Sequence, residues 1–251
     1  MTTDYDFWLF DLDGTLVDIE PAYPRKVMGA VGDRLGVEFT DRERDALWYG
    51  FGGTRSQTLA ERDVDQQEFW RLFHEEEDPV ARAEATYLYD DAEAFLATLD
   101  TPVGLVTHCQ QYLTEPVLDH LGIADWFETV VCCDDDIGWK PDPKPVELAM
   151  REMDVWYNGH SGVLAGDNPS DIGAAWNAGL DGVHVGRRSP AEMGRCVRGD
   201  RRVASLLDLA SSQEVVPVFH GDSRSGIDTS FVCRHGYPAV GSGRRGEVNA
   251  G

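Results

Sequence analysis

Apolar and polar positions follow two different patterns along the 251 residues. From residue 90 onward, short apolar runs alternate with stretches whose apolar residues recur at helical spacing. Together with the apolar run near the N-terminus, this pattern predicts strands at 7–10, 103–106, 129–132, 163–165 and 182–185, and helices at 90–99, 110–121, 144–153 and 170–178. Alternation of this kind indicates an α/β fold, a doubly wound parallel sheet with helices on both faces.

The segment between residues 18 and 88 shows helical spacing and no strand alternation. The pattern predicts helices at 22–35, 41–49, 65–74 and 80–87. Two of them begin at spacings typical of helix starts, Thr40 with Glu43 and Asp65 with Glu68. The core of this segment is expected to consist of aromatic side chains, namely Trp48, Phe69, Trp70 and Phe73.

These two patterns predict two domains. Residues 1–17 and 89–210 would form the larger domain around the sheet, and residues 18–88 a small all-helical domain inserted after its first strand. After Val185 the periodicity weakens, and 203–209 is expected to form a last short helix. Residues 211–251 are rich in Gly, Ser and Arg without periodicity, which predicts a flexible tail.

The chain is strongly acidic, with a formal net charge of −23 at pH 7. Up to residue 186 it carries 38 Asp and Glu against 12 Lys and Arg, and its only lysines are Lys26, Lys140 and Lys144. A dense carboxylate surface with little lysine is typical of halophilic proteins, because molar salt screens the repulsion. We therefore predict a halophilic protein, with ordinary acidity as the alternative. So negative a surface argues against nucleic acid as a partner.

Cysteine spacing and apolar runs exclude several other classes of protein. The five cysteines form no Cys-x-x-Cys and no paired Cys/His spacing that would hold a metal. The N-terminus lacks a basic region followed by an apolar one, and no apolar run is long enough to span a bilayer. We expect a cytoplasmic protein without a membrane partner, either a monomer or a homodimer.

The most informative stretch is Asp11–Leu12–Asp13–Gly14–Thr15, directly after the first predicted strand. Side chains alternate along a strand, so Asp11 and Asp13 would point to the same side. Two carboxylates there repel each other unless a divalent cation such as Mg²⁺ lies between them, and an aspartate so placed can attack phosphorus. Gly14 lets the backbone turn beside a ligand, and Thr15 offers a hydroxyl and an amide to phosphate oxygens. The alternative is a simple turn after an edge strand.

Three further polar segments follow later strands or the helix between them. Thr107 and His108 end the strand at 103–106, Gly138 to Pro143 contains Lys140, and Gly166 to Asp171 follows the strand at 163–165. In open α/β sheets, ligands bind outside the carboxyl ends of the strands. The sequence therefore predicts that these segments share one site with Asp11 and Asp13.

In this order, the four segments resemble the four motifs of the haloacid dehalogenase superfamily, most of whose members are Mg²⁺-dependent phosphatases. The resemblance covers roughly residues 5 to 210. It implies a Rossmann-like core and identifies 18–88 as a cap of the C1 type. It also implies that Asp11 is the nucleophile and Asp13 the acid/base, while Thr107 and Lys140 stabilise the phosphoryl group.

The resemblance further implies a Mg²⁺ site made of Asp11, Asp13, Asp167 and Asp171, the last ligating through water or supporting the others. The second motif departs from the family, because many relatives place Asn where this chain has His108. His108 would either donate to the phosphate or substrate, or merely pack at the end of the strand.

A segment of the predicted cap, Gly53–Thr54–Arg55–Ser56, looks like one found in sugar-phosphate members of the superfamily. An arginine at the start of a helix facing the cleft could bind a second anionic group of the substrate by paired hydrogen bonds. The alternative is that Arg55 is a surface arginine that solvates an acidic domain.

We therefore expect an enzyme that hydrolyses a small phosphorylated metabolite, phosphoglycolate or a sugar phosphate, through an aspartyl-phosphate on Asp11. A phosphomutase of the β-phosphoglucomutase type shares all four motifs and stays an alternative. A phosphonatase would need a lysine in the cap, where Lys26 is the only one. A non-catalytic binding protein on this fold would have no need of the acid/base Asp13. Haloacid dehalogenation is disfavoured, because the dehalogenases of the family lack that residue and need no metal.

Overall fold

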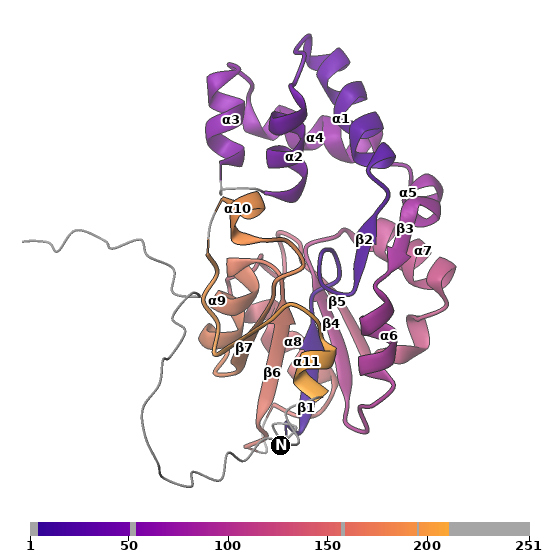
Figure 1. The fold of residues 1–251 in the computed structure, drawn as a ribbon, viewed down its shortest axis with the longest axis vertical. Coiled ribbons are helices and arrows are strands. Elements are labelled where there is room, and N and C mark those ends of the chain that lie inside the picture. Colours follow the sequence, from indigo (N-terminus) through magenta and orange to yellow (C-terminus); the bar gives the residue numbers. More distant parts are fainter. Residues whose placement is uncertain (1–4, 51–53, 157–158, 195, 211–251) are drawn as a thin grey trace, which may run out of the picture. The chain divides into compact units, whose positions relative to one another are not determined.

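A six-stranded parallel sheet forms the centre of the fold, in the order β5–β4–β1–β6–β7–β8 (Figure 1). Its strands are β1 (Phe7–Phe10), β4 (Val103–Thr107), β5 (Thr129–Cys132), β6 (Gly162–Gly166), β7 (Asp181–Val185) and β8 (Arg201–Val203). From the central β1 the later strands extend in both directions, so β1 lies where the strand order reverses. The carboxyl ends of strands at such a point form a crevice in which open α/β sheets bind ligands.

The computed structural model describes residues 5–50, 54–156, 159–194 and 196–210, all of which belong to one compact unit. The predicted tail at 211–251 and the predicted turn at 51–53 lie outside the described residues. Within the described ranges, no helix is both long and apolar enough to cross a membrane.

Helices cover both faces of the sheet, as predicted. On one face lie α6 (Asp90–Leu96), α7 (Gln111–Leu121) and α11 (Leu207–Ala210), and on the other α8 (Lys144–Glu152) and α9 (Pro169–Asn177). Alternation along β1 explains the two layers, because Trp8 and Phe10 pack in one hydrophobic cluster and Phe7 and Leu9 in the other. A strand that is buried on both faces is apolar at every position, as in the run at 7–10.

Five helices follow the first strands and share a hydrophobic cluster of their own. They are α1 (Ala22–Leu35), α2 (Asp41–Tyr49), α3 (Arg55–Glu61), α4 (Gln66–Glu76) and α5 (Pro79–Ala85). The predicted start at Thr40 is confirmed as a reciprocal capping box with Glu43, and Asp65 accepts a hydrogen bond from the Glu68 amide at 2.9 Å. Phe69 is fully buried in the cluster, and the other three predicted aromatic residues pack against it.

Three short strands correct the predictions. β2 (Val17–Ile19) and β3 (Thr86–Leu88) pair antiparallel, so residues 18–88 are not helical throughout and the predicted helix at 80–87 ends before its last residues. β8 forms the edge of the main sheet beside β7, so the predicted helix at 203–209 is replaced by a strand followed by the shorter α11. Strands of three residues are too short to show alternation, and their backbone pairing is set by tertiary packing.

Candidate active site

The carboxyl ends of the central strands open into a cavity of about 750 Å³. Loops after β1, β4 and β6 form one side, and α2, α4 and α5 contribute the other. Its lining includes all the site residues predicted from the sequence except Thr15, namely Asp11, Asp13, Gly14, Arg55, Thr107, His108, Lys140, Asp167 and Asp171. Thr15 lies directly behind Asp11 and donates its hydroxyl hydrogen to Oδ2 of that carboxylate at 3.3 Å.

Lys140 places a buried positive charge beside Asp11. Its Nζ donates to Asp11 Oδ1 at 2.7 Å and to the carbonyl oxygen of Val106 at 2.8 Å, and it forms an ion pair with Asp171 Oδ1 at 2.7 Å. Burial alone would lower the pKa of Lys140, but the charges of Asp11 and Asp171 raise it above its usual value. The ammonium group therefore stays charged and is fixed by three oxygen atoms.

Asp11, Asp167 and Asp171 form a cluster in which one oxygen atom of each lies within 4.8 Å of the others. Burial raises the pKa of Asp11 and that of Asp167, and the Asp11 charge raises the latter further. Three carboxylates against the single ammonium of Lys140 leave an excess of negative charge. Their oxygen donors and this charge suit a hard divalent cation such as Mg²⁺.

Two glycines allow the backbone to approach this cluster closely. Gly14 has φ +79°, and a Cβ there would lie 2.8 Å from Oδ2 of Asp167. A Cβ on Gly166 would collide with Oδ2 of Asp171. That oxygen accepts a hydrogen bond from the Asn168 amide at 2.8 Å, as part of the capping box at the start of α9. Any side chain at either glycine would displace a carboxylate of the cluster.

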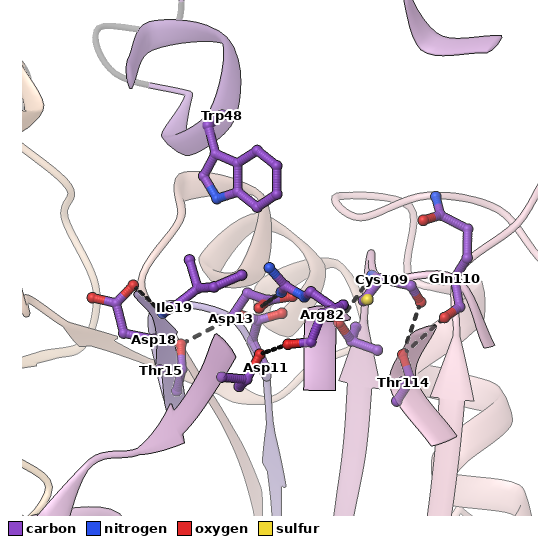
Figure 2. Close-up of polar contacts among 12 residues, drawn as sticks. Asp11, Asp13, Thr15, Asp18, Ile19, Trp48, Arg82, Cys109, Gln110 and Thr114 are labelled. Atoms are coloured by element: carbon purple, nitrogen blue, oxygen red, sulfur yellow. Dashed lines mark hydrogen bonds and ion pairs between the residues drawn. The ribbon is translucent and has the colours of Figure 1, made fainter. Parts of the chain in front are cut away.

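Asp13 lies outside this cluster, although the sequence predicts it as a fourth ligand. Its carboxylate forms an ion pair with the guanidinium of Arg82, a residue of α5 (Figure 2). Among the described residues, the carboxylates grouped for a cation are therefore those of Asp11, Asp167 and Asp171.

Thr107 and His108 lie at the end of β4 as predicted. The Thr107 hydroxyl oxygen accepts the Cys109 amide at 3.0 Å and is almost fully buried. Burial and the neighbouring Lys140 charge lower the pKa of His108 to about 4, so its ring is neutral at pH 7. The ring packs edge-on against Trp139 at a centroid distance of 5.6 Å and also lines the cavity. Both roles left open for His108 are compatible with this position.

Arg55 lines the cavity, but its guanidinium is engaged with the main chain. Nε donates to the carbonyl of Leu47 at 2.8 Å and Nη2 to that of Trp48 at 2.5 Å. The guanidinium also lies over the Trp70 ring, 5.6 Å from its centroid. These contacts satisfy carbonyl groups at the C-terminal end of α2. The sequence analysis considered substrate binding and surface solvation for Arg55, and did not consider this capping role.

Sequence reasoning missed several charged residues that the fold brings to the site. Besides Arg82 they include Glu77, Arg187 and Arg188. Arg187 donates to the Thr15 carbonyl from Nε at 3.2 Å and Nη2 at 2.7 Å, and to Asp91 from Nη1 at 2.6 Å. It thus fixes the loop that follows the predicted nucleophile. None of these residues belongs to a sequence motif. The one signal in the sequence was Arg82 itself, a charged residue between two alanines on a short helix.

Comparison with known proteins agrees with this geometry. The family model of the haloacid dehalogenase-like hydrolases matches residues 8–185. A phosphoglycolate phosphatase from Yersinia pseudotuberculosis is 30% identical over 179 residues, which cover 68% of this chain and 76% of the relative.

Solved structures share the fold at lower identity. A protein from Lactobacillus plantarum, provisionally named a phosphoglycolate phosphatase, superposes with a TM-score of 0.67 at 24% identity, covering 82% of this chain and 98% of its own. A protein from Thermotoga maritima, provisionally named a β-phosphoglucomutase, superposes with a TM-score of 0.58 at 20% identity, covering 81% of this chain and 96% of its own.

Proposed function

The chain belongs to the haloacid dehalogenase-like hydrolase family, and from that premise we propose that it is a Mg²⁺-dependent phosphatase acting on a small phosphorylated metabolite of the phosphoglycolate class. One observation carries the proposal, the Asp11 carboxylate held by the buried Lys140 ammonium at the edge of a cavity. The relatives named phosphoglycolate phosphatases favour that substrate class over other phosphate esters.

In the proposed reaction, an oxygen of Asp11 attacks phosphorus and forms an aspartyl-phosphate while the bond to the substrate alcohol breaks. Asp13 donates a proton to the leaving alcohol oxygen and then accepts one from the water that hydrolyses the aspartyl-phosphate, which regenerates free Asp11. Lys140, the Thr107 hydroxyl and the amides after Asp13 stabilise the charge on the equatorial phosphoryl oxygens.

Mg²⁺ would be held by Asp11 and Asp167, with Asp171 beside them. When bound, it would neutralise charge on the phosphoryl group and allow the anionic substrate to approach the acidic cluster. Lys140 alone cannot neutralise the charge of the phosphoryl group, since its own charge is shared between Asp11 and Asp171.

We further propose that helices α1–α5 act as a cap of the C1 type, the role predicted for residues 18–88. Trp48, Trp70 and Arg82 of these helices line the cavity opposite the strand ends. Closure of such a segment would exclude bulk water from the aspartyl-phosphate. The acidic composition further leads us to propose adaptation to high salt.

The metal requirement tests the proposal. We expect release of inorganic phosphate from 2-phosphoglycolate to stop in EDTA and to return with Mg²⁺. Asp167→Asn should raise the Mg²⁺ concentration for half-maximal activity at least about tenfold, the scale of a lost metal-site interaction. Asp125→Asn removes an exposed carboxylate outside the cavity and serves as the control. Full activity after thorough chelation would contradict the metal assignment.

The second candidate, a phosphomutase, is favoured by the fold shared with the Thermotoga maritima protein. The same assay separates the two functions when a sugar phosphate and a catalytic amount of the corresponding bisphosphate are supplied. Accumulation of an isomeric sugar phosphate without release of inorganic phosphate would indicate the mutase.

A further inference from the structure

We propose that Arg82 binds a carboxylate group of the substrate and so selects phosphate monoesters of short hydroxy acids. The inference rests on the proposed phosphatase function and adds the residue that distinguishes among its substrates.

Arg82 is a buried cation at the cavity, with 4% of its surface exposed. It lies on α5, which packs against α7, and its Nη2 forms the ion pair with Asp13. The Trp48 ring lies over one face of the guanidinium, 5.6 Å from Cζ to the ring centroid, and Figure 2 shows the indole extending from α2 toward this ion pair. The indole covers this face, so a ligand would approach the guanidinium from another side.

Two nitrogen atoms of that guanidinium are unused. Nε and Nη1 are buried, and no described residue accepts a hydrogen bond from either. Buried N–H groups without an acceptor are unfavourable, and those of a charged group especially so. A carboxylate supplied by a ligand in the cavity would satisfy one of them, because each open edge of the guanidinium pairs Nε or Nη1 with a hydrogen of Nη2 and matches a planar carboxylate.

Contact with Asp13 limits how far this carboxylate can be from the phosphate. Asp13 is the proposed proton donor to the leaving oxygen, so it lies one hydrogen bond from that atom. Three hydrogen bonds, each about 3 Å long, then connect the leaving oxygen to a carboxylate bound by Arg82, so the two lie in the same part of the cavity. A substrate with a carboxylate near its ester oxygen, as in 2-phosphoglycolate, can reach both Asp13 and Arg82, whereas the hydroxyls of a sugar phosphate would offer the guanidinium no second anion.

Other cations lining the cavity are already engaged. Arg55 binds two main-chain carbonyls, and Arg188 pairs with Asp18 at 3.1 Å and lies over the Tyr49 ring at 4.1 Å. Glu77, the other carboxyl near Arg82, is buried, with its pKa raised to about 7 by burial, and it accepts no hydrogen bond from Nε or Nη1 of Arg82.

The test compares three compounds, 2-phosphoglycolate, its neutral amide and p-nitrophenyl phosphate, with the wild-type protein and the variants Arg82→Lys and Arg82→Met. We expect the wild type to prefer the acid over the amide by about 10- to 100-fold in kcat/KM, mostly through KM, the usual contribution of hydrogen bonds to a charged group. Arg82→Met should lose this preference, and Arg82→Lys should keep part of it. Arg71→Met changes an exposed arginine of α4 outside the cavity and should keep the preference.

The outcomes separate the inference from the proposed function. If the wild type hydrolyses p-nitrophenyl phosphate and has equal kcat/KM for the acid and the amide, the role of Arg82 is overturned. The proposed phosphatase function is then unaffected. Failure to hydrolyse any of the three compounds with Mg²⁺ present would overturn both. If Arg82→Met does not fold, the wild-type comparison and Arg82→Lys decide, since Lys retains the charge that pairs with Asp13. An undiminished preference in Arg82→Lys and Arg82→Met would also contradict the inference.

Discussion

At the scale of single residues, the site depends on a few buried charges with fixed partners. Lys140 donates hydrogen bonds to Asp11 and Val106 and forms an ion pair with Asp171, so three oxygen atoms determine its position together. Such a set holds the predicted nucleophile in one orientation before substrate binds. An arginine in this place could not present the same compact charge.

Glu77 allows a prediction about the pH dependence of stability. Burial raises its pKa from the usual 4.5 to about 7. The unfolded chain ionises this group near 4.5, so the stability associated with its neutral form is present below that pH and is lost as the pH rises through about 7. Glu77→Gln should therefore raise the free energy of unfolding at pH 8, by up to about 3 kcal/mol, and should give no gain at pH 4.

Urea unfolding at pH 4 and pH 8 measures this difference. Glu84→Gln, an exposed carboxyl on the neighbouring helix α5, is the matched control and should change little at either pH. A Glu77→Gln variant that is equally or less stable than wild type at pH 8 would show that this carboxyl is not destabilising when ionised.

Sequence reasoning reached some of these residues and not others, for a physical reason. Asp11, Thr107, Lys140 and Asp167 lie in short motifs at strand ends or in the loop before a helix, where chain order alone brings them to one edge of the sheet. Arg82 reaches the site from a helix of the inserted segment. Its position depends on how that segment packs, which local sequence does not encode.

At the scale of elements, Arg187 connects three parts of the fold. From the loop after β7 it binds the Thr15 carbonyl in the loop after β1 and the Asp91 carboxylate at the start of α6. The Arg187 side chain is 9% exposed and that of Asp91 15%. Arg187→Met would remove the arginine's hydrogen bonds to the Thr15 carbonyl and, among the described residues, leave the Asp91 carboxylate with only the Ser205 hydroxyl and the Leu206 amide as donors. We expect a loss of up to about 3 kcal/mol in the free energy of unfolding together with lower activity.

Chemical unfolding with wild type and variant measures this loss. Arg151→Met removes an exposed pair with Glu147 on α8 and should cost less than about 1 kcal/mol. If the two variants lose equal stability, the Arg187 contacts do not stabilise the fold more than a surface ion pair does.

The accuracy of the element predictions followed element length. The 14-residue helix α1 was predicted at its observed bounds, because several turns repeat the same pattern, and the shorter α2 was predicted at its bounds with the help of its start signal at Thr40 and Glu43. β2, β3 and β8 have three residues each, and their pairing joins segments far apart in the chain. The short helix α3 was missed as well, since seven residues provide few repeats. The division into two domains and the tail stay predictions.

At the scale of the whole molecule, the net charge of −23 at pH 7 leads to a prediction about salt. The Debye length is about 30 Å at 0.01 M and about 3 Å at 1 M, so carboxylates across the surface repel one another only at low ionic strength. The melting temperature should therefore rise between about 0.05 M and 3 M KCl, and activity should fail at low salt before the main sheet unfolds. Thermal melts and assays across this range measure both. A melting temperature that is flat or falls with salt would contradict halophilic adaptation.

The central claim is that Asp11 attacks phosphorus, and the most direct test is the rate of phosphate release by Asp11→Asn. With Mg²⁺ and 2-phosphoglycolate, the wild type should release inorganic phosphate steadily. Asp11→Asn, which keeps the side-chain shape and removes the attacking oxygen anion, should be slower by at least about 10³-fold while its circular dichroism spectrum is unchanged. A folded Asp11→Asn protein that releases phosphate within tenfold of the wild-type rate would contradict the account.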